Sequence, residues 1–324
     1  MINFAVIDLG SNSVRMTITQ IKKDASIEVT HQLKEMVRLS ENMGPKKILQ
    51  AEPIERTLNA LKEFKKIYAA LPNVHIEALA TAAVRQAVNQ ADFLKLVKKE
   101  IGLNFQVITG RREAYLDFLG VTKTLAVGDN CLIIDTGGAS TELILVKDQQ
   151  VRKLISLPFG SVTISQTFNL NDEIKASDLF LAMTAIEKEL TDVNWLFEAH
   201  KSKLVVLGGS NRTLAKIARR KLNLDPLPDL HGFKLPSQNA FEIFANLVDR
   251  DRKEREKIPG LSKVRADVIV GGLIPISLIL RTLHIPEILF SNHGLREGAF
   301  FDYLETSKLE VPTSSIQPPG DFEH

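Results

Sequence analysis

The sequence has one cysteine, almost no net charge and no hydrophobic segment of membrane-spanning length. Cys131 stands alone among 324 residues, which excludes an intramolecular disulfide and a cysteine-rich metal site and fits a reducing compartment. The 41 basic and 39 acidic residues leave a formal charge of +2, so no overall field attracts nucleic acid or an anionic membrane. The most apolar stretch, 268–280, is too short to cross a bilayer and contains Pro275. We expect a buried helix there.

Two other signals are missing. The seven histidines are scattered without the spacing of zinc ligands, so we expect no histidine-based metal site. No basic segment precedes the first apolar stretch, which ends at Asp8, so we expect no signal peptide. Together these absences predict a cytoplasmic protein with neither nucleic acid nor a membrane as partner.

Two short segments, in contrast, repeat one pattern. They read F-A-V-I-D-L-G-S-N-S from Phe4 and C-L-I-I-D-T-G-G-A-S-T-E from Cys131. A buried strand would carry each aspartate to a sheet edge, where glycine lets backbone N–H groups and hydroxyls surround phosphate oxygens. Because a carboxylate repels phosphate, its expected role is to hold a hard cation such as Mg²⁺. One such segment alone is more often a simple turn. The repetition, with Glu142 added, favours a metal-phosphate cleft between two related halves.

Length and element order predict two α/β domains. A chain of 324 residues exceeds the usual size of a single core. Strands and helices alternate in its hydrophobic pattern, and a hairpin formed by 131–135 and 141–147 restarts the pattern in the second half. Charges of both signs crowd between Asp249 and Lys257, as is typical of a solvated helix end. We expect domains over 1–124 and 125–305, with a last helix that could pack back on the first domain, and a disordered tail over 306–324.

Eight blocks of sequence resemble one known family. They are D-L-G-S-N-S-V-R from Asp8, A-T-A-A-V-R-Q-A-V-N from Ala80, T-G-R-R-E-A from Thr109, D-T-G-G-A-S-T-E from Asp135, L-P-F-G-S from Leu157, L-G-G-S-N-R-T-L-A from Leu207, R-A-D-V-I-V-G-G from Arg265 and G-L-R-E-G from Gly294. Their order resembles that of the exopolyphosphatase / guanosine pentaphosphate phosphatase family, to about residue 305. The resemblance implies two actin-like, ribonuclease H-like domains around a cleft. It also implies Mg²⁺-dependent removal of terminal phosphate from inorganic polyphosphate or guanosine pentaphosphate.

The candidate site combines a base, a cation site and phosphate contacts. Glu113 lies in the first turn of a predicted helix after a buried strand, where it could orient a water and accept its proton; the resemblance places it at the family's catalytic glutamate. A glutamate that merely stabilises a helix N-terminus would look the same. Asp8, Asp135 and Glu142 form the expected Mg²⁺ set. The candidate phosphate contacts are Ser11, Asn12, Ser13, Arg15, Arg85, Gly137, Gly138, Ser140, Gly208, Gly209 and Arg265.

Several of these assignments have ordinary alternatives. For Arg15 and Arg85 the alternative is a surface ion pair, and Arg265 is assigned by the resemblance. Many relatives have a glutamate where Arg112 stands, a departure that either favours ionised Glu113 or adds a phosphate contact. Ala139 stands where relatives have a third glycine. Either its backbone geometry is ordinary or the loop is reshaped.

Three classes of function fit the sequence. The first is a phosphatase of polyphosphate, guanosine pentaphosphate or both, expected as a homodimer. The second is an actin-like ATPase or sugar kinase, which shares the two repeated loops but does not explain T-G-R-R-E-A or G-L-R-E-G. The third is a non-catalytic sensor of polyphosphate or guanosine tetraphosphate. Longer family members carry a further helical region that this sequence does not contain, so we expect limited processivity on long chains.

Overall fold

The computed structural model describes residues 1–224 and 229–307, which form two compact units. The first contains Met1–Thr124 and the chain from Gly294 onward, and the second contains Leu125–His293. The division falls after Thr124, and the last helix of the chain groups with the first unit. The tail expected over 306–324 lies, from residue 308 on, outside the described residues.

The first unit is built on a five-stranded sheet with the order β3-β2-β1-β4-β5. Its strands are β1 (Ile2–Leu9), β2 (Val14–Ile21), β3 (Ile27–Glu35), β4 (Val74–Ala80) and β5 (Gln106–Val107). Its helices are α1 (Ala51–Tyr68), α2 (Ala82–Gln86), α3 (Gln90–Ile101), α4 (Gly110–Thr122) and α11 (Leu295–Thr306). β1 pairs with β2 in antiparallel and with β4 in parallel orientation.

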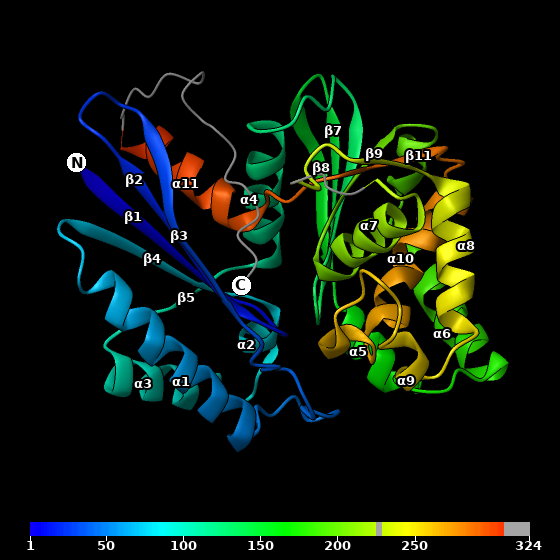
Figure 1. The fold of residues 1–324 in the computed structure, drawn as a ribbon, viewed down its shortest axis with the longest axis horizontal. Helices are drawn as coiled ribbons and strands as arrows, with labels where there is room; N and C mark the ends of the chain where they lie inside the picture. Colours follow the sequence, from blue (N-terminus) through cyan, green and yellow to red (C-terminus); the bar gives the residue numbers. More distant parts are fainter. Residues whose placement is uncertain (225–228, 308–324) are drawn as a thin grey trace. The chain divides into compact units, whose positions relative to one another are not determined.

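Strand alternation divides the side chains of this sheet between two layers of helices. Ala5, Ile7 and Leu9 of β1 share one core with α1 and α3. Phe4 faces the opposite side, where its ring contacts Phe300 and Tyr303 of α11. Figure 1 shows α1 and α3 on one face of this sheet and α4 and α11 on the other. Because side chains alternate along a strand, Asp8 lies on the face of Phe4, the face that α11 covers.

The second unit is built on a six-stranded sheet with the order β10-β11-β9-β6-β7-β8. Its strands are β6 (Cys131–Thr136), β7 (Thr141–Lys147), β8 (Gln150–Leu157), β9 (Lys203–Leu207), β10 (Lys234–Pro236) and β11 (Glu287–Phe290). Its helices are α5 (Ser161–Thr167), α6 (Ala176–Thr191), α7 (Gly209–Lys221), α8 (Ser237–Val248), α9 (Arg252–Arg255) and α10 (Ile269–Thr282), with 3₁₀ turns η1 (Leu196–Ala199) and η2 (Lys263–Arg265).

One large core joins this sheet to its helices. Leu132 and Ile134 of β6 pack with buried residues of α6, α8 and α10. The apolar segment predicted as a buried helix is α10, and the helix continues through Pro275. Cys131, Ile133 and Asp135 alternate to the other face of the sheet. In the part of the chain that the structure describes, no helix is both long and apolar enough to span a bilayer.

Candidate functional site

The first repeated loop is held in place by its own unit. It connects the β1–β2 hairpin, whose last register pair is Leu9 with Val14, and the Gly10 N–H donates to the Ser13 carbonyl at 3.1 Å. The side chains of Ser11 and Ser13 are almost entirely buried. The Ser11 carbonyl accepts a hydrogen bond from the Ser40 N–H, and the Asn12 carbonyl accepts one from the Arg38 N–H, each at 2.9 Å. The predicted phosphate loop is therefore fixed by backbone contacts.

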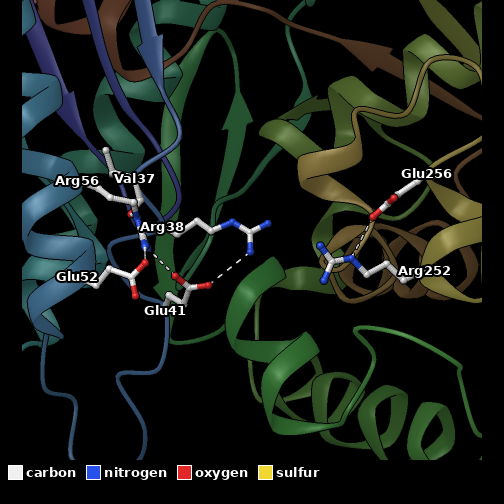
Figure 2. A network of polar contacts seen from close by, with 7 residues as sticks. All are labelled: Val37, Arg38, Glu41, Glu52, Arg56, Arg252 and Glu256. Atoms are coloured by element: carbon white, nitrogen blue, oxygen red, sulfur yellow. Dashed lines mark hydrogen bonds and ion pairs between the residues drawn. The ribbon is translucent and has the colours of Figure 1, made fainter.

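An ion-pair network secures the segment that supports this loop. Arg56 of α1 donates to the Val37 carbonyl at 3.1 Å and pairs with Glu41 at 2.5 Å and Glu52 at 2.8 Å. Figure 2 shows this network, with Arg38 also reaching Glu41 at 3.5 Å. The sequence analysis did not assign Arg56 any role. Its i, i+4 spacing from Glu52 predicts only an ordinary helix pair, and the contact to Val37 depends on the folded unit.

Two pairs of opposite charge lie near the carboxyl ends of the strands in this unit. Asp8 and Arg15 are directly opposite in the β1–β2 register, so their side chains share one face of the sheet. Arg85 of α2 donates to Glu113 Oε2 at 2.9 Å and, from the same nitrogen, to the Ile108 carbonyl at 2.9 Å. Arg85 thus has the ion pair considered as the alternative to phosphate binding. Its contact with phosphate stays a prediction.

Glu113 occupies the expected place at the start of α4. The helix begins at Gly110, and its cap, Thr109, accepts from the Arg112 N–H at 3.1 Å. The Glu113 side chain is only 12% exposed. Arg112 takes a different direction, because its guanidinium binds Asp302 of α11. Arg112 thus has a protein partner within the first unit.

In the second unit two candidate cation ligands are cross-strand neighbours. Asp135 of β6 lies directly opposite Glu142 of β7, so the two carboxylates share one face of the sheet. Glu142 is almost fully buried and accepts a hydrogen bond from Ser156 Oγ at 2.7 Å. Ser156 was not predicted as a site residue, although its place on the next strand, in register with Glu142, is the signal that could have identified it.

The second repeated loop is shaped by α5. The carbonyl of Gly137 accepts from the Ser161 N–H at 2.9 Å, and that of Gly138 accepts from the Val162 N–H at 2.9 Å. A Cβ at Gly160 would lie only 2.6 Å from the Gly138 carbonyl carbon. Ser140, itself buried, closes the loop by accepting from the Gly137 N–H at 3.0 Å.

Ala139 of the same loop settles one of the open alternatives. Its side chain is 2% exposed, and it is not one of the described residues with positive φ. A positive φ is what would require glycine here. The backbone at Ala139 is therefore ordinary, and alanine fits this position without strain.

A third loop brings Gly208, Gly209 and Arg265 together beside Asp135. Gly208 has φ 93° and ψ 162°, a conformation open almost only to glycine. A Cβ there would collide with the Thr136 carbonyl and approach Asp135 Oδ1 to 2.7 Å. A Cβ at Gly209 would collide with the guanidinium of Arg265, which is 7% exposed. The predicted anion loop at the start of α7 therefore has a buried cation packed against it.

The donor set fits a hard cation in part. Asp135 and Glu142 supply carboxylate oxygens on one sheet face, and such oxygens are the ligands that Mg²⁺ prefers. Asp8, the third expected ligand, belongs to the first unit. Within residues 1–224 and 229–307, no three or more His, Cys, Asp and Glu side chains come together as a metal site. The Mg²⁺ set thus stays a prediction.

Comparison with known proteins identifies the family. Residues 17–307 match the Ppx/GppA phosphatase family. The chain is 30% identical to a putative exopolyphosphatase of Haemophilus influenzae, over 92% of this chain and 90% of that protein. It is 32% identical to a bifunctional 3-dehydroquinate synthase/phosphatase of Fusobacterium nucleatum, over 93% of this chain. The chain spans 46%, about half, of the length of that protein.

Solved structures agree with this assignment. An exopolyphosphatase from Cytophaga hutchinsonii superposes with a TM-score of 0.87 at 26% identity, over 95% of this chain and 99% of that chain. The Ppx/GppA family member of Aquifex aeolicus gives a TM-score of 0.78 at 31% identity, with the same coverage of 95% and 99%. The fold is therefore the actin-like, two-domain α/β architecture, and the chain belongs to the Ppx/GppA phosphatase family.

Proposed function

We propose that this family phosphatase removes the terminal phosphate from inorganic polyphosphate, guanosine pentaphosphate or both, with Glu113 as the general base. The observation that carries the proposal is the Arg85–Glu113 pair at 2.9 Å. It holds a nearly buried carboxylate in one orientation at the start of α4. A base held in this way can take the proton of an attacking water as the phosphoanhydride bond breaks.

The other candidate residues bind and orient the phosphate chain in this proposal. Backbone N–H groups and hydroxyls of the two repeated loops contact terminal phosphate oxygens, and Arg265 at Gly209 adds positive charge. Asp135 and Glu142, with Asp8, are the residues that would hold Mg²⁺. When bound, Mg²⁺ neutralises charge on phosphate oxygens. A homodimer and a cytoplasmic location remain predictions.

The decisive variant is Glu113→Gln, which keeps the size of the side chain and removes its ability to accept a proton. We expect turnover to fall about 10²- to 10⁴-fold with KM nearly unchanged. Glu63→Gln on α1, an exposed glutamate paired with Lys66, is the matched control and should behave as wild type. Wild-type turnover by Glu113→Gln would end the assignment of the base.

Substrate choice is measured in the same assay. Phosphate release from polyphosphate, guanosine pentaphosphate and ATP is compared side by side with Mg²⁺, with and without a sugar acceptor. Faster release from the first two supports the proposal. Rapid ATP turnover or transfer to the sugar would favour the actin-like ATPase or sugar kinase class, and binding without turnover of any substrate would favour a sensor.

A further inference from the structure

The residue before Glu113 forms an ion pair between α4 and α11. The Arg112 guanidinium meets the Asp302 carboxylate through two hydrogen bonds, Nη1 to Oδ1 at 3.1 Å and Nη2 to Oδ2 at 2.5 Å. The two side chains are 37% and 23% exposed. Paired bonds of this kind fix direction as well as distance. Because the two residues are 190 positions apart, the pair ties the last helix to the first turn of α4.

Further along α4 from this pair, the backbones of α4 and α11 lie in close contact. A Cβ at Gly298 of α11 would collide with the Leu116 carbonyl group, 2.6 Å from its carbon. A Cβ at Gly120 of α4 would likewise collide with the Gly294 carbonyl. Such close approach leaves little freedom for the middle of α4 to move against α11. The first turn of α4 lies outside these close backbone contacts, which are made at Leu116 and Gly120.

The first turn of a helix has the fewest backbone bonds to hold it. Its leading N–H groups lack partners within the helix; here the Thr109 side chain accepts from the Arg112 N–H at 3.1 Å, and the Thr109 carbonyl accepts from the Glu113 N–H at 3.0 Å. Adjacent helical residues point about 100° apart, so Arg112 can bind Asp302 while Glu113 binds Arg85. The first turn of α4 is thus held by two ion pairs, Arg85–Glu113 and Arg112–Asp302.

We propose that Arg112 and Asp302 form a positioning pair that keeps the Glu113 carboxylate in its reactive orientation. The inference rests on the proposed role of Glu113 as base. Neither residue belongs to the loops assigned to phosphate. A displacement of about 1 Å in a catalytic group can cost up to about 100-fold in rate. Loss of the pair should therefore lower kcat about tenfold and leave KM nearly unchanged.

Other charged and aromatic groups face the pair and are retained in the test. The carboxyl pKa of Glu77 of β4 is raised, first by burial and then by the negative charge of Asp302. The positive charge of Arg112 lowers it. The Tyr115 ring lies 5.7 Å from the Arg112 guanidinium carbon. Any variant at position 112 is accordingly compared with one at 302, since both break the pair but change the charge near Glu77 in opposite directions.

The experiment measures kcat and KM for Arg112→Gln, Asp302→Asn and Arg112→Lys on whichever of polyphosphate and guanosine pentaphosphate the wild type cleaves faster. Arg112→Gln and Asp302→Asn should lower kcat by the same factor. Arg112→Lys keeps the charge but cannot form the two parallel hydrogen bonds, so its kcat should lie between theirs and that of the wild type. Glu305→Gln breaks the Lys123–Glu305 pair of 2.9 Å, which joins the residue after α4 to a glutamate one turn beyond Asp302 on α11. It is the matched control and should keep wild-type kcat.

A double variant separates positioning from general stability. Adding Arg112→Gln to Glu113→Gln should cost no further activity, because Arg112 acts through a base that is already lost. A further tenfold loss would show a merely structural role and overturn the inference. If Arg112→Gln does not fold, Arg112→Lys in both backgrounds decides the question.

The outcomes also distinguish this inference from the proposed function. Wild-type kcat in Arg112→Gln and Asp302→Asn, alongside a slow Glu113→Gln, refutes the positioning pair alone. Wild-type turnover in Glu113→Gln refutes the role of the base, and the positioning pair with it.

Discussion

Substitution of Gly208 by alanine tests the packing on which the second-unit site depends. The backbone there has φ 93° and ψ 162°, and forcing a non-glycine residue into such a region costs about 1–3 kcal/mol. The new Cβ would also collide with the Thr136 carbonyl and lie 2.7 Å from Asp135 Oδ1. Overpacking of this kind adds about 1–3 kcal/mol. We therefore expect Gly208→Ala to lower the free energy of unfolding by about 2–6 kcal/mol.

Gly232→Ala is the matched control, because it keeps the backbone penalty without the collision. Gly232 lies in the same unit with φ 81°, and among the described residues its Cβ would approach only Leu125 Cδ1, at 3.7 Å. We expect a cost of about 1–2 kcal/mol from the backbone alone. The difference between the two variants isolates the contact of the Gly208 loop with Asp135 and Thr136.

Urea unfolding followed by tryptophan fluorescence measures both variants. Trp195, the single tryptophan of the sequence, lies in the second unit, so its signal reports the unit that carries the change. In a unit of this size each kcal/mol corresponds to about 2–4 °C in Tm, which gives a second readout. If Gly208→Ala is no more destabilising than Gly232→Ala, the inference that the Gly208 loop packs closely against Asp135 and Thr136 is wrong.

Three further results are expected. Asp135→Asn should shift Mg²⁺ activation to higher concentration, because an amide oxygen binds a hard cation less strongly than a carboxylate; an unchanged Mg²⁺ titration would contradict the cation site. The Cys131 thiol, whose pKa burial raises to about 12, should resist a thiol reagent at pH 8 until the protein is unfolded, and fast labelling of folded protein would disprove this. Burial raises the pKa of Glu77 in the folded state, so its contribution to stability is fully present below the unfolded pKa and is lost as the pH rises through the folded pKa. Glu77→Gln should therefore raise Tm more at pH 8 than at pH 4, and an equal change at both would show that Glu77 does not titrate as inferred.

Elements defined by local pattern were predicted well from the sequence. The hairpin expected over 131–135 and 141–147 is formed by β6 and β7, with β6 one residue longer. Each is a run of apolar residues bounded by turn signals, which a strand pattern alone can locate. The helix α5 was not predicted, because its N-terminus is capped by carbonyls of Gly137 and Gly138 from another segment.

The charge-rich segment 249–257 shows where local pattern misleads. It was predicted to be a solvated helix end, which fits Arg252, whose exposed side chain pairs with Glu256 at 3.2 Å (Figure 2). The prediction is wrong for Arg255, which is fully buried. Its Nη2 donates to the Asp172 carbonyl at 2.6 Å, and burial lowers its pKa. The acceptor lies 83 positions away, so no window of neighbouring residues contains the reason for burial.

The same limit applies to the arginines around Glu113, with more consequence for function. The family resemblance located Arg85 and marked Arg112 as a departure, but neither partner could be inferred from spacing. Glu113 is 28 positions from Arg85, and Asp302 is 190 positions from Arg112. A charge whose partner is distant in sequence has, in the sequence alone, the same appearance as a free phosphate contact. In the folded unit Arg85 binds Glu113, and its neighbour Arg112 binds Asp302. If Glu113 is the base, as we propose, the departure at 112 changes the support of the base rather than the base itself.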